Sequence, residues 1–215
     1  VMLSHLMNRT YACPTVCSAL MSQADMVLLL DNRALVDRVV LAADPGTQTG
    51  WALLLRTNDG GVVPVASWIL GRRSEKKAGA LTPARAPTFV DQLALVRDVC
   101  AFCAEEFPAP VIVCEDWFAG PNPNTVRDVV SQFYFIQAAA DAAGLTFRAV
   151  HNQTWKKSYL GRGNMKTADA LVAYSAKGYE AHGVERWGRA VNQLTMSDDA
   201  AALGLAHHYM STEAT

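Results

Sequence analysis

An α/β domain, with a mixed sheet flanked by helices, is the fold class that this sequence predicts. Short apolar runs end at turns or at acidic residues, and a glycine-rich turn joins two of them as a hairpin. Longer segments with helical spacing lie between the later runs. With 215 residues, 51% of them hydrophobic, the chain can bury one full-sized core. These observations favour a single layered domain.

The first half of the predicted sheet is built from three strands. Residues 38–43 (RVVLAA) form an apolar run that stops at Asp-Pro-Gly, which is typical of a buried strand ending in a turn. Residues 51–56 and 62–70 are the next two strands, and the turn at 58–61 (NDGG) joins them as an antiparallel hairpin. The polar segment 71–87 is expected to be a surface loop.

The second half alternates helices with two further strands. Apolar positions recur at helical spacing before and after the run VIVC, which ends in an acidic pair. The predicted elements are helix 88–107, strand 111–114, helix 125–143 capped by Asn124, strand 145–150, and helices 166–181 and 197–210, the last capped by Ser197. The sheet is therefore expected to have five strands.

The first 25 residues differ from the rest of the chain. They show no clear period and no cationic start followed by a long apolar stretch. We expect residues 1–25 to be an N-terminal extension that is either disordered or, if translation begins near Met21, not translated. Residues 26–215 are expected to form the folded domain.

Composition argues against several classes of protein. The 19 basic and 20 acidic residues nearly balance, so any affinity for nucleic acid must come from local charge. Residues 148–189 supply such a region, with eight basic and three acidic residues, although a solvated surface explains it equally well. No apolar run reaches the length of a membrane span. Five cysteines, an odd number, predict reduced thiols and a cytoplasmic location.

Three acidic residues lie at boundaries of predicted elements. Asp44 follows the first strand, Glu115 follows the fourth, and Asp198 lies in the first turn of the last helix. The C-terminal ends of parallel neighbouring strands meet at one edge of a sheet, where α/β proteins bind ligands. Clustered carboxylates need a cation, and Mg²⁺ or Mn²⁺ suits such oxygen ligands. Taken singly, each acid is more often a turn or helix-capping residue.

The surrounding motifs are similar to those of one nuclease family. LAADPGTQTGWA (41–52) resembles the first strand and hairpin of the RuvC-type Holliday junction resolvases, and VIVCEDWF (111–118) resembles their central strand. KKSYLGRGNMK (156–166) is similar to their basic Gly-x-Gly segment, and DDAAALGLA (198–206) to their last helix. The motifs occur in the family's order over about residues 38–210.

This resemblance implies an RNase H-like fold and a Mg²⁺-dependent endonuclease that resolves Holliday junctions in DNA recombination and repair. It implies catalytic and metal-binding roles for Asp44, Glu115 and Asp198 at a centre of two Mg²⁺ ions, which Mn²⁺ could replace. The DNA-binding residues that it implies are Phe118, with Trp117 beside it, for base stacking, and Lys156, Lys157, Arg162 and Lys166 for phosphate contacts. A core role for Trp117 remains open. A homodimer is expected, with the apolar helix at 124–143 as a candidate interface, and no nucleotide cofactor.

One position departs from the family pattern. The last helix of these resolvases carries two acids three residues apart, and the second position here is Ala201. Asp199 points about 100° away from Asp198 on a helix, so it is a poor geometric substitute, although a distorted first turn could recruit it as a metal ligand. Ala201 therefore leaves catalytic competence open, but it does not affect the predicted fold.

Three alternatives stay open. A binder of branched DNA that has lost its chemistry would explain Ala201. Related nucleases that act on forks, flaps or transposon ends share the same acids. The D-x-G-x-x-x-G pattern beginning at Asp44 also occurs in sugar kinases and actin-like ATPases, but those need a second domain for which the chain is too short.

Overall fold

The computed structural model describes residues 35–46, 48–71, 97, 100–101, 104–105, 107, 110–117, 123–166, 169–170, 172–173, 185–187 and 198–213. The expected extension at 1–25 and most of the loop at 71–87 lie outside these residues. The elements in chain order are β1 (Val36–Asp44), β2 (Gln48–Thr57), β3 (Val62–Gly71), β4 (Val111–Glu115), α5 (Pro123–Ala142), β5 (Thr146–Val150), α6 (Asn152–Leu160), β6 (Glu185–Trp187) and α8 (Asp198–Thr212).

The strands form one mixed sheet in the order β5-β4-β1-β2-β3-β6. β1, β2 and β3 are antiparallel neighbours, whereas β1 with β4, β4 with β5, and β3 with β6 run parallel. The predicted α/β class with a mixed sheet and flanking helices is confirmed. The predicted count of five strands is wrong, because the described residues contain a sixth strand, β6. Its three residues are too few to show a period, and the strand depends on its pairing with β3.

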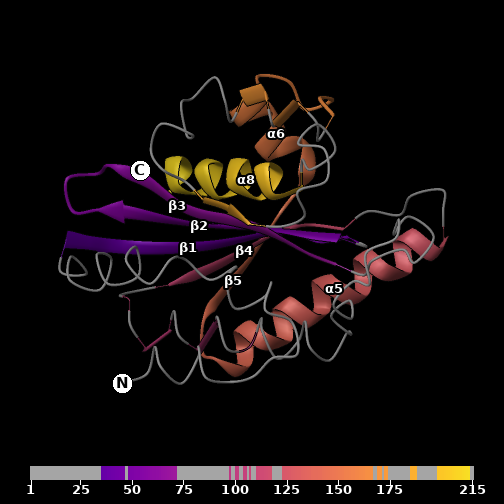
Figure 1. Ribbon diagram of the computed structural model, residues 1–215, viewed down its shortest axis with the longest axis horizontal. Coiled ribbons are helices and arrows are strands. Elements are labelled where there is room, and N and C mark those ends of the chain that lie inside the picture. The colour runs from indigo at the N-terminus through magenta and orange to yellow at the C-terminus, as the bar shows by residue number, and fades with distance from the viewer. Residues whose placement is uncertain are drawn as a thin grey trace, which may run out of the picture.

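Helices cover both faces of the sheet (Figure 1). Val39, Leu41 and Ala43 of β1 belong to the core cluster on the α5 face, and Val40 and Ala42 belong to the cluster that includes α8. Successive side chains of a strand point to opposite faces, so a strand buried on both sides must be apolar throughout. This is why the run that ends in Asp44 has no alternation of polar and apolar residues.

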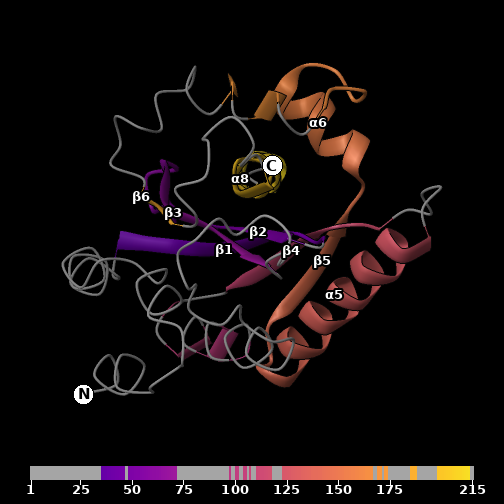
Figure 2. The same ribbon diagram turned by 45° about the vertical axis from the view of Figure 1, so that its right-hand side comes forward.

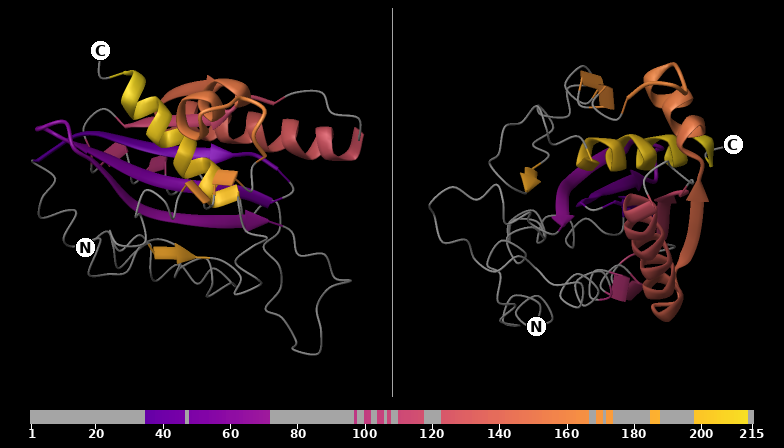
Figure 3. Two further views of the ribbon diagram at one scale, coloured as in Figure 1. Left: turned by 90° about the horizontal axis from the view of Figure 1, so that it is seen from above. Right: turned by 90° about the vertical axis from the view of Figure 1, so that its right-hand side faces the viewer.

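The two helix layers differ in their elements. α8 lies over the sheet with α6 beside it, and α5 lies on the opposite face next to β5, as the turned views show (Figures 2 and 3). α8 is buried almost all round, which is typical of a helix enclosed between a sheet and another element. Within the described ranges, the helices are too short or too polar to serve as membrane spans.

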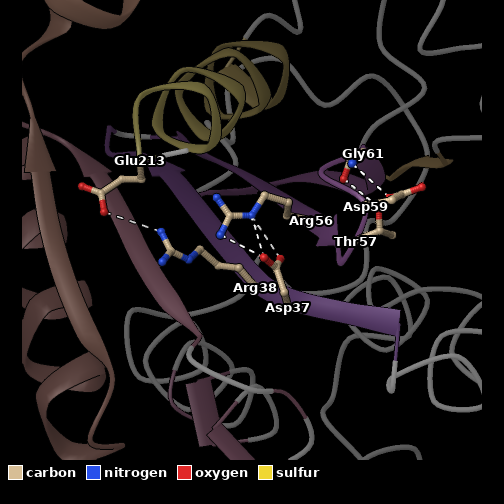
Figure 4. Close-up of polar contacts among 7 residues, drawn as sticks. All are labelled: Asp37, Arg38, Arg56, Thr57, Asp59, Gly61 and Glu213. Carbon is tan, nitrogen blue, oxygen red and sulfur yellow. Dashed lines mark hydrogen bonds and ion pairs between the residues drawn. The ribbon is translucent and has the colours of Figure 1, made fainter. Parts of the chain in front are cut away.

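Ion pairs join the start of β1 to the residue after α8 and to β2. Glu213, which follows α8, lies 3.5 Å from the Arg38 guanidinium of β1. Arg56 of β2 donates to both carboxylate oxygens of Asp37 at 3.0 Å (Figure 4). Since Arg38 lies near the start of β1, α8 must run antiparallel to β1 and present its first residue near the end of that strand.

The predicted hairpin between β2 and β3 is present. Asp59 accepts hydrogen bonds from the Thr57 hydroxyl and, at 3.2 Å, from the Gly61 backbone N–H (Figure 4). Gly60 has a φ of 84°, which a residue with a side chain rarely adopts. The aspartate and glycines that predicted a turn at 58–61 are therefore the residues that close the hairpin.

Helix boundaries differ from prediction at two places. α5 begins at Pro123 rather than after a cap at Asn124, because proline is well suited to the first helical position. α6 lies between the predicted strand 145–150 and the predicted helix 166–181, where no helix was predicted. The His151 imidazole accepts from the Gln153 N–H at its start, and Gly161, with a φ of 86°, ends it.

Candidate metal centre

Asp44 and Glu115 end two parallel, neighbouring strands. Ala43 of β1 is in register with Cys114 of β4, so the residues that follow them stand side by side at one edge of the sheet. Both acids are partly buried and keep some exposure to solvent. The sequence left open whether these two strands are neighbours, and the structure pairs them in parallel.

A close approach at Gly50 brings Asp198 to the same edge. Gly50 of β2 lies opposite Asp44 in the β1–β2 pairing. A methyl group on Gly50 would collide with the backbone carbonyl of Asp198 and crowd the Asp199 N–H. Only glycine therefore lets the first turn of α8 rest on the strand beside Asp44.

Gly50→Ala should separate the helix from the strand at this point. We expect it to lower the free energy of unfolding by about 1–3 kcal/mol, because the added methyl meets backbone rather than a movable side chain. Urea unfolding measures the effect. Gly61→Ala is the comparison and should cost less, since its added methyl comes within 2.8 Å of the Thr57 hydroxyl but meets no backbone atom. Equal stability of Gly50→Ala and wild type would contradict the close contact.

The three carboxyl groups affect one another electrostatically. Burial raises the pKa of Asp44 well above its usual range, and the charges of Glu115 and Asp198 raise it further. Burial, followed by the charges of Asp199 and Glu115, raises the pKa of Asp198 to about 6. Burial also raises the pKa of Glu115. The acids from β1, β4 and α8 therefore form one cluster in which full ionisation is unfavourable.

This cluster has the donor chemistry of a divalent-ion site. In the described part of the chain, no group of three or more His, Cys, Asp or Glu side chains is arranged so that it could hold a metal ion. The acids are nevertheless oxygen ligands at a partly exposed edge, the type that Mg²⁺ prefers. A bound cation would remove the repulsion that raises the pKa of Asp44. The donor chemistry of these residues therefore suits a divalent ion.

Lys156 adds a positive charge to this cluster. It is buried, at 5% exposure, and its ammonium lies 5.4 Å from the ring centre of Trp155. Its charge lowers the pKa of both Asp44 and Glu115, opposing the effect of burial. The buried Lys156 side chain thus lies near the carboxylates. Its expected contact with DNA phosphate stays a prediction.

The other basic candidates remain on the surface. Lys157, Arg162 and Lys166 are exposed, on α6 or just after it. The glycines between them have structural roles that the sequence did not reveal. Gly161 ends α6 in a left-handed conformation, and a methyl on Gly163 would come within 3.0 Å of the Gln153 carbonyl oxygen. The tight packing of this segment thus presents its basic side chains outward.

The structure describes only one of the two aromatic candidates for base stacking. Trp117 is partly buried and packs against the core cluster on the α5 face, which is the core role that the sequence left open. Phe118 lies outside the described residues. It therefore remains the sequence-based candidate for base stacking.

Asp199 and Ala201 are both fully buried. The carboxylates that act on Asp44 most strongly are Glu115 and Asp198. Asp199 acts on Asp198, its neighbour in the chain. Ala201 belongs to the α8-face core cluster. A role for Asp199 as a metal ligand stays a prediction.

Two residues at the site were missed by the sequence analysis. The Asn152 amide donates to Oε1 of Glu115 at 3.1 Å, and the Trp155 indole N–H donates to Oε2 at 2.6 Å. Both belong to α6, which was not predicted. The available signal was a tryptophan that needs a partner for its N–H if buried, placed three residues after an asparagine.

Comparison with solved structures identifies the fold. RuvC of Thermus thermophilus has a TM-score of 0.52 at 16% identity, and the match covers 82% of this chain and 96% of that chain. The same organism's RuvC in complex with a Holliday junction substrate has a TM-score of 0.53 at 17% identity, covering 79% and 91%. The fold is that of the RuvC-type resolvases.

A eukaryotic member of this structural group is similar over nearly the whole length. The yeast mitochondrial Holliday junction resolvase Ydc2 has a TM-score of 0.52 at 14% identity, and the match covers 99% of this chain and 93% of that chain. No family model and no curated protein matches the sequence. The RuvC-like, RNase H-like fold implied by the motifs is therefore confirmed from structure at low sequence identity.

Proposed function

We propose that this chain is a divalent-metal-dependent endonuclease that cleaves branched DNA, with the four-way junction as its main substrate. The observation that carries the proposal is the convergence of Asp44, Glu115 and Asp198 from β1, β4 and α8 at one sheet edge. The fold shared with RuvC and Ydc2, which are Holliday junction resolvases, supports it.

Asp44, Glu115 and Asp198 would hold two Mg²⁺ ions, whose chemistry in such centres is to activate water and stabilise the departing oxygen. The protein's own contribution is to keep the acids ionised and oriented. The positive charge of Lys156 favours the ionised forms of Asp44 and Glu115. Asn152 and Trp155 each donate to one oxygen of Glu115. Gly50 holds the start of α8 in place.

DNA would be held by the exposed basic residues on α6 and just after it. Lys157, Arg162 and Lys166 are the proposed phosphate contacts, and Phe118 is the proposed stacking residue. A four-way junction offers two related cleavage points, so we also propose a homodimer. Tyr134, 53% exposed on α5, and the partly buried Phe135 next to it are compatible with the interface suggested for this helix.

Lys157→Ala combined with Lys166→Ala should weaken junction binding and its dependence on salt. Each lost phosphate contact is expected to reduce the slope of log affinity against log salt concentration by about 0.9. Fluorescence anisotropy with a labelled junction at several salt concentrations measures the slope. An unchanged slope would place the DNA surface elsewhere.

The function is tested with end-labelled DNA of matched sequence, folded as a four-way junction, a fork, a flap or a linear duplex. We expect Mg²⁺-dependent nicking that is fastest on the junction. Faster nicking of forks or flaps would support a nuclease, but one whose main substrate is not the four-way junction. Tight junction binding with no nicking in Mg²⁺ or Mn²⁺ would contradict the nuclease.

A junction-binding protein without cleavage is the second candidate, and Ala201 is the observation that favours it. Ala201 stands where the resembled family has its second helical acid, and it is fully buried. A missing ligand would weaken one of the two ions most. The same assay separates the two functions, because the second candidate predicts junction binding and no product at any metal concentration.

A further inference from the structure

Both oxygens of the Glu115 carboxylate are held by one helix. Asn152, the first residue of α6, donates to Oε1 at 3.1 Å, and Trp155, one turn later, donates to Oε2 at 2.6 Å. A carboxylate oxygen can accept more than one hydrogen bond or cation, so each oxygen still has a lone pair available. The two donors fix the direction in which those lone pairs point.

Trp155 is itself fixed by α8, the helix that carries Asp198. The Trp155 side chain is fully buried. A methyl on Gly204 would come within 3.0 Å of Cζ3 of Trp155 and within 2.6 Å of Cδ1 of Tyr159. α6 and α8 therefore pack directly against each other at this glycine. The contact links the orientation of Glu115 to the position of the helix that supplies Asp198.

We propose that Trp155 and Asn152 are positioning residues that set the Glu115 carboxylate for Mg²⁺, with Gly204 as the contact that holds Trp155 in place. This inference rests on the proposed metal-dependent function. Carboxylates that bind metals are commonly oriented by hydrogen bonds of this kind, and losing such a partner typically costs about 10- to 100-fold in metal affinity. Mg²⁺ requires nearly octahedral geometry, whereas Ca²⁺ accepts irregular coordination.

The test measures Mg²⁺ and Ca²⁺ binding separately, by isothermal titration of metal-free protein. Trp155→Phe removes the N–H and keeps an aromatic ring, and Asn152→Ala removes the other donor. We expect each to lower Mg²⁺ affinity about tenfold or more and Ca²⁺ affinity less, so that the preference for Mg²⁺ falls. Gly204→Ala, which touches no carboxylate, should shift the preference in the same direction.

Met210→Ala is the matched control. Met210 is also buried in α8, 1% exposed, but lies twelve residues from Asp198, about 18 Å along the helix. Met210→Ala should lower the free energy of unfolding and leave the Mg²⁺ and Ca²⁺ affinities unchanged. If Trp155→Phe does not fold, Asn152→Ala, at the partly exposed start of α6, carries the test.

The outcomes separate this inference from the function on which it rests. An unchanged ratio of Mg²⁺ to Ca²⁺ affinity in Asn152→Ala and Trp155→Phe would show that the donors serve stability alone, and would overturn the inference while leaving the metal centre intact. A folded wild-type protein that binds neither ion would overturn the proposed function, and the inference with it.

Discussion

Asp44→Asn should abolish junction cleavage and leave junction binding unchanged or tighter. Asparagine has nearly the same shape as aspartate but is a weak, uncharged ligand for a hard cation. A loss of about 4 kcal/mol of transition-state stabilisation, a modest share of what bound ions supply, corresponds to a thousandfold slower reaction. Binding should not suffer, because one negative charge near the DNA phosphates is removed.

Single-turnover cleavage of a labelled junction and anisotropy binding measure the two quantities on the same protein. Asp37→Asn is the control, since Asp37 is an acid of the same strand whose carboxylate pairs with Arg56 at the strand's other end. It should cut at a normal rate. Cleavage by Asp44→Asn within tenfold of wild type would remove Asp44 from the chemistry.

Mg²⁺ should raise the melting temperature of wild-type protein and have little effect on Asp44→Asn. An ion present at a hundred times its dissociation constant stabilises the folded state by about 2.7 kcal/mol. For a domain of this size, that corresponds to a shift of about 5–10 °C. Without metal, Asp44→Asn should have a higher melting temperature than wild type. The substitution removes a charge that burial and two neighbouring acids disfavour.

The stability of the metal-free protein should also depend on pH, because of the three clustered carboxyl groups. The folded pKa of Asp44, Glu115 and Asp198 is raised, to about 6 for Asp198. The folded protein therefore binds more protons than the unfolded chain at pH values between the two pKa values. The stability that these three acids contribute to the metal-free protein should fall as pH rises from about 4 through about 6, while the lowered pKa of His208 acts in the opposite direction towards the upper end of this range. Differential scanning fluorimetry across this range, with and without Mg²⁺, measures it. A metal-free melting temperature that rises with pH would contradict the clustered carboxylates.

The strands that carry the site were predictable because their sequences are unambiguous. Residues 38–43 and 111–114 are apolar throughout, as strands buried on both faces must be, and each is followed by an acid. Their parallel pairing then placed Asp44 beside Glu115. Asp198 was predictable only as a helix-start acid, since its contact with Gly50 depends on the tertiary structure.

α6 could not be predicted for a physical reason. Its buried residues are Trp155, Lys156 and Tyr159, and a lysine within the buried face hides the helical pattern. The helix is stabilised by contacts that sequence spacing does not show, namely the packing of Trp155 and Tyr159 around Gly204. The hydrogen bonds to Glu115 join residues 37 and 40 positions apart, so they appear only once α6 is in place.

Binding of Mn²⁺ to the protein with a junction made uncleavable at its scissile bonds tests the central claim most directly. Beyond the Mn²⁺ bound by the same junction alone, equilibrium dialysis should give two Mn²⁺ per wild-type chain, and few or none when Asp44→Asn and Glu115→Gln are combined. Equal Mn²⁺ binding by wild type and the double variant would show that these carboxylates do not hold the ions.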